Sequence, residues 1–254
     1  MFWPGCSRRR SLKRSRSTGV TPSAPSSSSG RDLPSLTSAQ AREVDRLTAE
    51  RFRVPVEWLM EAAGWQVARH CEGLAVVVCG HGNNGGDGLA AARHLHRWGR
   101  LKSVACTDRA ALKGPAALEA EALEAMGVEI RAEPDFGAAR TIVDALLGTG
   151  LSRPPGGKYA EWIQTINSAG KQVLAVDVPS GLETDTGKAL DPTVRADLTV
   201  TLGLPKPGLR KLDGPGLAGT VWVVDIGIPF EAYAAVGATV PHDLYSMQDQ
   251  VRLA

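Results

Sequence analysis

The sequence has no apolar run approaching the roughly 20 residues that a membrane-spanning helix requires, so we expect no membrane segment. It also has few cysteines: Cys6, Cys71, Cys79 and Cys106 form no CxxC pair and no other metal-like spacing. This pattern argues against a disulfide framework and favours a reducing compartment. We find no internal repeat and no sign of a second folded domain.

A basic surface is missing from the part of the chain that can fold. Residues 1–34 hold seven Lys and Arg side chains against Asp32, whereas the rest of the chain has more acids than bases. Without a basic stripe on the folded part, we expect no nucleic-acid partner. Residues 1–34 are rich in Ser, Arg and Pro, so we expect a disordered tail. The tail is typical either of a transit peptide, which indicates mitochondria or plastids, or of a non-native extension on a cytoplasmic protein.

From residue 36 onward, short apolar runs alternate with helical patterns. Such alternation predicts an α/β fold, a three-layer α/β/α sandwich with a Rossmann-like, mostly parallel sheet. Thr37 to Gln40 resembles a capping box that opens a helix extending to about Arg51. We place the domain at residues 36–237 and treat residues 238–254 as a C-terminal extension. The expected strands are Leu74–Cys79, Ser103–Thr107, Val128–Arg131, Thr141–Leu147, Gln172–Val176, Leu198–Leu202 and Thr220–Asp225.

The expected carboxyl end of the first strand is followed by a Gly-rich segment, Gly80–Gly88, with a helix from about Asp87. In parallel sheets ligands bind at this edge. We expect the glycines to allow left-handed backbone and a close approach of phosphate, and Asn83, Asn84 and Asp87 to add polar groups. The GxGxxG match at residues 80, 82 and 85 is weak evidence by itself, although Asp108 lies near the place of the acid that a dinucleotide fingerprint also requires.

Three further strand ends carry polar side chains. Asp144 lies within an apolar run and is followed by Gly148, Thr149, Gly150 and Arg153, which can cradle a phosphate. Asp177 and Ser180 follow the next strand, and these oxygen-rich ends can together hold a hard cation. After residue 202, prolines on both sides stiffen the loop around Lys206, which can bind phosphate or act as an acid. We interpret His94 and His96 as surface residues.

These segments, in this order, resemble the NAD(P)H-hydrate epimerase family, also described as the YjeF N-terminal domain, over about residues 36–237. The run from Gly82 to Gly88 is the most specific part of the resemblance, and Asp177–Gly181 is the next. His81 stands where the family often has proline, and we expect only its backbone to contribute. The resemblance implies a potassium ion held by Asn84, Asp144 and Ser180. The substrate-binding residues that it implies are Asn83, Asn84, Gly85, Gly86, Asp87, Gly148, Thr149, Gly150, Leu151, Ser152, Arg153, Pro154 and Asp177.

The activity implied by the resemblance is epimerisation at C6 of the R and S forms of hydrated NADH and NADPH, called NADHX and NADPHX. Loss of the C6 hydroxyl as water and its return to the other face require an acid and a base. We assign Asp177 and Lys206 to this catalytic pair. The resemblance also leads us to expect a homodimer and a separate NAD(P)H-hydrate dehydratase in the same pathway.

Two other functions remain open at this point. The chain could be a non-catalytic scaffold that binds a nucleotide or RNA-related partner, because an RNA-decapping scaffold protein has this fold. Retention of Asp144, Asp177 and Lys206 argues against that function. The chain could also be an NAD-dependent oxidoreductase, although we find no catalytic domain for hydride transfer.

Overall fold

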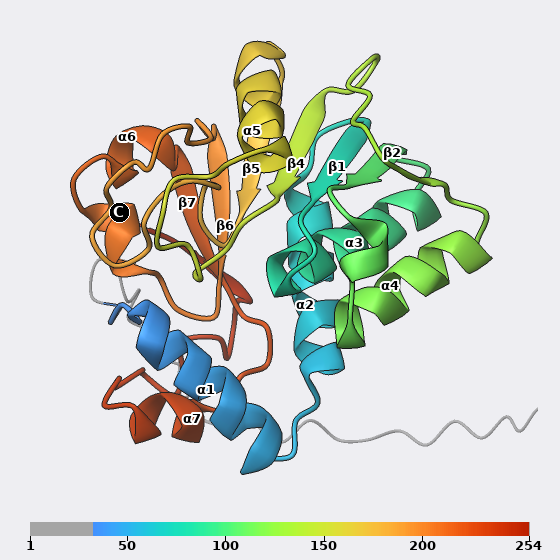
Figure 1. Cartoon of the computed structure of the whole chain (residues 1–254). Coiled ribbons are helices and arrows are strands. Elements are labelled where there is room, and N and C mark those ends of the chain that lie inside the picture. The colour runs from blue at the N-terminus through green and yellow to red at the C-terminus, as the bar shows by residue number, and fades with distance from the viewer. Residues whose placement is uncertain (1–32, 254) are drawn as a thin grey trace, which may run out of the picture.

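A computed structural model describes residues 33–253 of the chain, which fold around one eight-stranded sheet (Figure 1). The strand order is β3-β2-β1-β4-β5-β6-β7-β8, and all neighbouring pairs are parallel except β7 and β8. The strands are β1 (Ala75–Cys79), β2 (Leu101–Cys106), β3 (Ile130–Arg131), β4 (Thr141–Ala145), β5 (Gln172–Val176), β6 (Leu198–Leu202), β7 (Thr220–Val224) and β8 (Gln250–Arg252). The predicted mostly parallel α/β sandwich is confirmed.

Helices cover both faces of this sheet. One face packs against α2 (Val56–His70), α3 (Asn83–Arg97) and α4 (Gly114–Ala125), and the other packs against α5 (Lys158–Ser168). Every residue of β1 and β4 is buried, as strands covered on both faces require. The shorter helical segments are α6 (Gly214–Leu217), α7 (Phe230–Ala235), and the 3₁₀ turns η1 (Arg109–Ala111) and η2 (Pro207–Arg210).

The first helix, α1 (Ser38–Glu50), lies beside α7, next to the main sandwich (Figure 1). Its capping box is formed as predicted: the Thr37 hydroxyl accepts from the Gln40 amide, and the Gln40 side chain accepts from the Thr37 amide. The Ser38 amide and hydroxyl both donate to Asp185, at 2.6 and 2.9 Å. The Leu36 amide donates to the Pro205 carbonyl at 2.9 Å, so α1 is fixed to the loop that carries Lys206.

The start of α3 differs from our expectation. Most of the predicted Gly-rich loop is helical, because α3 begins at Asn83 and contains Gly85, Gly86 and Gly88. No glycine in Gly80–Gly88 has a positive φ, so the expected left-handed backbone is wrong. The reason for glycine is close packing: a Cβ on Gly88 would lie 2.4 Å from the Ala145 Cβ.

The C-terminal residues join the same sheet. The expected extension, residues 238–254, contributes β8, which was not predicted, and Val240, Leu244 and Val251 are buried against α1 and α7. Tyr245 donates its hydroxyl to the Gly203 carbonyl at 2.9 Å, directly after β6. Of the expected tail, residues 1–34, the first 32 lie outside the described residues. The structure describes the last two, Leu33 and Pro34, and Leu33 is buried. Within residues 33–253, no helix has the length and apolar character needed to cross a membrane.

Candidate functional site

A cavity of about 230 Å³ opens between α1 and the carboxyl ends of the central strands. Its walls combine apolar side chains with three carboxylates and one ammonium, Asp45, Asp87, Asp177 and Lys206. The other lining residues are Leu36, Ala41, Arg42, Val44, Val56, Leu59, Met60, Asn83, Asn84, Gly148, Thr149, Leu202, Leu204, Ile226 and Ile228. An apolar cavity with a few convergent polar groups is typical of a small-molecule site.

Asp177 lies at the end of β5 in an unusual backbone conformation. Its φ is 65°, and the Val178 amide donates across it to the Val176 carbonyl at 2.8 Å, as in a γ-turn. Non-glycine residues rarely adopt a positive φ, and such strain gathers at functional sites. The Asp177 Oδ1 accepts from the Leu202 amide at 3.0 Å and from the Thr201 hydroxyl at 3.2 Å. The turn therefore holds this carboxylate at the cavity wall.

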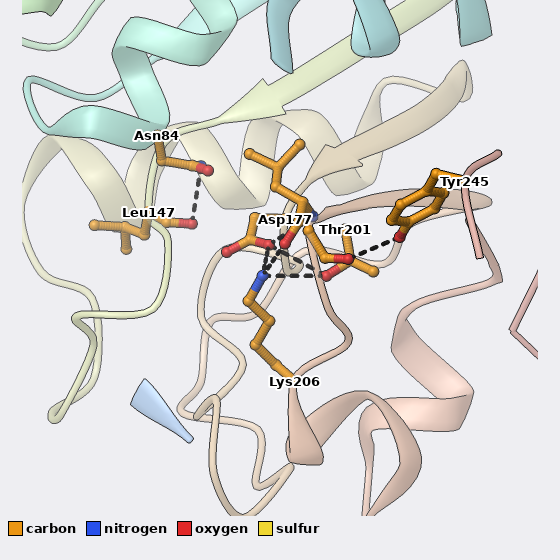
Figure 2. Close-up of polar contacts among 8 residues, drawn as sticks. Asn84, Leu147, Asp177, Thr201, Lys206 and Tyr245 are labelled. Carbon is orange, nitrogen blue, oxygen red and sulfur yellow. Dashed lines mark hydrogen bonds and ion pairs between the residues drawn. The ribbon is translucent and has the colours of Figure 1, made fainter. Parts of the chain in front are cut away.

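Lys206 forms an ion pair with Asp177 (Figure 2). Its Nζ donates to Asp177 Oδ1 and, at 2.9 Å, to the Leu202 carbonyl, with Thr201 Oγ1 at 3.5 Å. The Lys206 side chain is only 4% exposed. A buried ammonium requires such partners, because water no longer solvates it. The structure thus brings together the two residues assigned to the catalytic pair.

The N-terminal turns of α3 bring Asn83, Asn84 and Asp87 to the same cavity. Asp87 has no hydrogen-bond partner among residues 33–253, and loss of hydration raises the pKa of its carboxyl well above the usual range. The charges of Asp177 and Asp45 raise this pKa further. Gly85 and Gly86 do not line the cavity. Gly85 packs against the Gly80 backbone and Gly86 against the Met60 side chain, and a Cβ at either position would clash.

The three residues assigned to the metal meet beside the cavity. The Ser180 hydroxyl donates to Asp144 Oδ1 at 2.6 Å, and the Ser180 amide donates to Oδ2 at 2.9 Å. The Asn84 side-chain amide donates to the Leu147 carbonyl at 3.2 Å, and the Ser180 hydroxyl lies 3.2 Å from the same oxygen. Burial raises the pKa of Asp144 to about 6, and the hydrogen bonds from Ser180 oppose that rise. Of the three, only Asn84 also lines the cavity.

The loop after β4 is only partly at the site. Gly148 and Thr149 line the cavity, whereas Gly150, Leu151, Ser152, Arg153 and Pro154 do not. Arg153 is exposed. These five residues therefore lie outside the cavity.

Sequence reasoning missed the wall that α1 contributes. Ala41, Arg42, Val44 and Asp45 all line the cavity, together with Leu36 just before the helix. The capping box predicted the helix, but no sequence signal indicated where the helix would dock. Ile226 and Ile228, which follow β7, were missed for the same reason.

Three other sequence interpretations are corrected by the structure. The His81 ring contributes more than backbone, because its Nδ1 lies 2.9 Å from the Tyr159 hydroxyl. His94 is buried at 4% exposure, so its assignment to the surface is wrong, whereas His96 is exposed. Asp108 caps η1 by accepting from the Ala110 and Ala111 amides, and it does not line the cavity.

Comparisons with known proteins place the chain among named relatives. Residues 56–208 match the family described as "YjeF-related protein N-terminus". A protein named "NAD(P)H-hydrate epimerase" from Rhodopirellula baltica is 39% identical over 213 residues, which cover 78% of this chain and 86% of that protein. A protein of the same name from Limosilactobacillus fermentum is 39% identical over 198 residues, covering 75% and 95%.

Longer relatives and a solved structure extend the comparison. The "Bifunctional NAD(P)H-hydrate repair enzyme Nnr" of Thermofilum pendens is 42% identical over 207 residues, which cover 75% of this chain but only 40% of that protein. The crystal structure titled "yeast ynu0, YNL200c" has the same fold, with a TM-score of 0.71 at 24% identity. That match covers 87% of this chain and 100% of the yeast chain. Because the family match takes in more than half of the sequence, the chain belongs to the YjeF-related N-terminal family.

Proposed function

We propose that this chain is an NAD(P)H-hydrate epimerase, which interconverts the R and S forms of NADHX and NADPHX at C6. Two relatives that match it at 39% identity over most of their length are named for this activity. The observation that carries the proposal is the buried Lys206–Asp177 pair at the strand ends, facing a cavity inside that shared domain. Strained backbone and perturbed ionisable pairs gather at functional sites, which favours an enzyme over a scaffold.

The reaction requires cleavage and reformation of one C–O bond. In the hydrate, the C6 hydroxyl lies next to the ring nitrogen, whose lone pair can expel it as water and leave a planar cation. Water then adds to the opposite face and inverts C6. A site for this reaction must supply a proton to the departing oxygen, remove one from the incoming water, and present negative charge to the cation.

The residues of the cavity match these requirements. The carboxyl groups of Asp45, Asp87 and Asp177 line the cavity together with the cations Arg42 and Lys206, and a carboxylate that faces the ring stabilises its positive charge. Lys206 holds Asp177 in place through Oδ1, and Asp177 Oδ2 accepts no hydrogen bond from residues 33–253. This free oxygen can take or give the proton of the C6 hydroxyl. We leave open which member of the pair is the acid, because both directions must operate.

The cavity is large enough for only one end of a dinucleotide. A volume of about 230 Å³ is below the roughly 300–1,000 Å³ of pockets that enclose drug-sized ligands. We infer that the nicotinamide end enters the cavity and the rest of the dinucleotide extends over Asn83 and residues 148–154. The N-terminus of α3 has no side-chain cap, so its amide groups can receive a phosphate there.

The neighbouring oxygen cluster fits a potassium ion. Asn84, Asp144, Ser180 and the Leu147 carbonyl supply only oxygen ligands, which hard cations prefer. Asp144 has no cationic partner among residues 33–253, and a buried carboxylate is stabilised by a nearby cation. When bound, potassium would supply positive charge beside the cavity and hold the Leu147 loop against α3. This cation remains a proposal.

The direct test is to supply one epimer of NADHX to the purified chain and follow the other by chromatography. Catalysed interconversion supports the proposal. A chain that binds the hydrate without interconverting it would be a scaffold, and hydride transfer from NADH would indicate an oxidoreductase. The homodimer stays a prediction, which the molecular mass in solution checks. The separate dehydratase also stays a prediction: if it is correct, the purified chain should not dehydrate NADHX back to NADH.

A further inference from the structure

The cavity wall formed by α1 carries a carboxylate that the chemistry above does not yet use. Arg42 and Asp45 are one helical turn apart, and both line the cavity. Asp45 makes no hydrogen bond and no ion pair with any residue in 33–253, whereas its neighbour Glu43 pairs with Arg46. A carboxylate without a partner at a cavity wall is available to a ligand.

The position of α1 is fixed by contacts that do not involve Asp45. The Ser38–Asp185 hydrogen bonds, the Leu36–Pro205 bond and the Gln40 side chain, which donates to the Val236 carbonyl at 3.1 Å, fasten the helix. The wall that presents Asp45 is therefore tied to the loop that presents Lys206. These contacts keep Asp45 at the cavity wall.

The electrostatic surroundings suit Asp45 for proton transfer. Although Asp45 as a whole residue is exposed, partial burial of its carboxyl raises the pKa of this group to about 6. The nearby Lys206 opposes that rise and Asp177 adds to it. An acid or base is most effective when its pKa lies near the working pH. The charged and titratable groups around Asp45 are Arg42, Asp87, Asp177, Lys206 and Tyr233.

Inversion at C6 requires proton transfer on both faces of the ring. Asp177 and Lys206 come from the ends of β5 and β6, so they serve the face that the sheet presents. Asp45 comes from a helix on a different wall of the cavity. Water that adds to the face turned away from the sheet needs a base on that side. Asp45 is the carboxylate of α1 that lines the cavity, so it can be this base.

We propose that Asp45 is a second catalytic residue of the epimerase, which serves the face of the nicotinamide ring opposite Asp177 and Lys206. On the sheet side, the C6–O bond breaks, the hydroxyl takes a proton from the Asp177–Lys206 pair, and the nitrogen lone pair forms the C=N bond. Water then bonds to C6 from the α1 side and gives a proton to Asp45, while the C=N pair returns to nitrogen. Proton exchange with solvent resets both groups, and the reverse direction uses the same steps. This inference depends on the proposed function.

The test compares Asp45→Asn with Glu43→Gln, which alters a carboxylate on the same helix outside the cavity. We expect Asp45→Asn to lower kcat about 100-fold, the contribution typical of an acid–base residue, with KM little changed. Glu43→Gln should retain wild-type kcat, and Asp45→Glu should recover part of the lost rate. Because Asp45 makes no hydrogen bond to residues 33–253, the circular dichroism of Asp45→Asn should match the wild type, and its Tm at neutral pH should be no lower.

The pH profile gives a readout that a merely structural role would not change. In the wild type, kcat/KM should fall as pH drops through about 6, because Asp45 then carries a proton and can no longer act as the base. The residual activity of Asp45→Asn should lack this acid limb. An Asp45→Asn variant with wild-type kcat and an unchanged acid limb overturns the inference and leaves the proposed function intact. A wild-type chain without epimerase activity overturns both.

Discussion

Lys206 donates a hydrogen bond to the carboxylate of Asp177, although the two residues follow different strands and both are nearly buried. The pair joins the ends of β5 and β6 at a cavity that α1 also lines. Because each member of the pair satisfies the charge of the other, function and stability are coupled at this position.

This coupling predicts a specific pattern of stabilities. Lys206→Met should lower the free energy of unfolding by about 3–5 kcal/mol, because it leaves the buried Asp177 carboxylate without its cation. Adding Asp177→Asn to Lys206→Met should recover most of that loss without restoring epimerase activity. Urea denaturation of the two single variants and the double variant measures the coupling. Strictly additive losses would show that the two side chains do not interact.

Gly88 of α3 is predicted to stabilise the fold by allowing close packing against β4. Gly88→Ala should destabilise the fold by about 1–3 kcal/mol, because the new Cβ would lie 2.4 Å from the Ala145 Cβ and 3.0 Å from the Cys79 Sγ. Gly82→Ala is the matched control, since no atom lies within 4 Å of its Cβ position and its φ is −93°. Thermal melts compare the two variants. Equal Tm values would contradict the packing role of Gly88.

His94 is predicted to make the fold sensitive to acid. Burial lowers its pKa to about 4, so the folded chain binds fewer protons there than the unfolded chain, in which the pKa is about 6.5. Stability from this position is complete above pH 6.5 and is lost as pH falls toward 4. Glu61 Oε1 lies 3.1 Å from the His94 Nε2 and should offset part of the loss, which we expect to be about 1–3 kcal/mol.

Replacing His94 by Leu should remove this part of the pH dependence. His96→Leu, on the exposed side of the same helix, should leave it unchanged. Urea unfolding between pH 4 and pH 7 measures the slope for each chain. A His94→Leu variant with the wild-type slope would show that another group titrates in this range.

The oxygen cluster at Asp144 predicts a cation-dependent Tm. Potassium should raise the Tm of the wild-type chain with increasing concentration, because a ligand that binds only the folded state stabilises it. Ser180→Ala removes the hydroxyl that contacts Asp144 and the Leu147 carbonyl, so this variant should respond more weakly. Lithium at equal ionic strength is the control for salt effects. Equal shifts in both chains, or with both cations, would exclude a potassium site here.

Much of the fold could be predicted, because the buried parallel strands appear as uninterrupted apolar runs. The predicted bounds of Gln172–Val176 and Leu198–Leu202 coincide with those of β5 and β6. The start of α3 could not be predicted, since glycines ordinarily indicate a loop and their packing against Ala145 depends on the assembled sheet. The β8 strand is three residues long and offers no pattern of its own.

The site divides in the same way. Asp144, Asp177, Ser180 and Lys206 were identifiable because each is a polar residue at or near the end of a predicted strand. Asp45 was not identifiable, because a charged residue on a helix is ordinarily solvated and only the docking of α1 turns it toward the cavity. The sequence likewise gives no sign of the positive φ at Asp177.

The central claim is that the Asp177–Lys206 pair interconverts the epimers of a hydrated nicotinamide nucleotide. The most direct measurement is the rate at which one pure epimer of NADHX converts to the other, with the wild-type chain and with Asp177→Asn. Asparagine tolerates the positive φ at this position and its side-chain oxygen can still accept from Lys206, so we expect a folded variant of lowered stability, which circular dichroism checks. We predict catalysed interconversion by the wild type and a rate at least about 100-fold lower for Asp177→Asn. Equal rates for the two chains, or a wild-type rate no higher than that in buffer, would contradict the account.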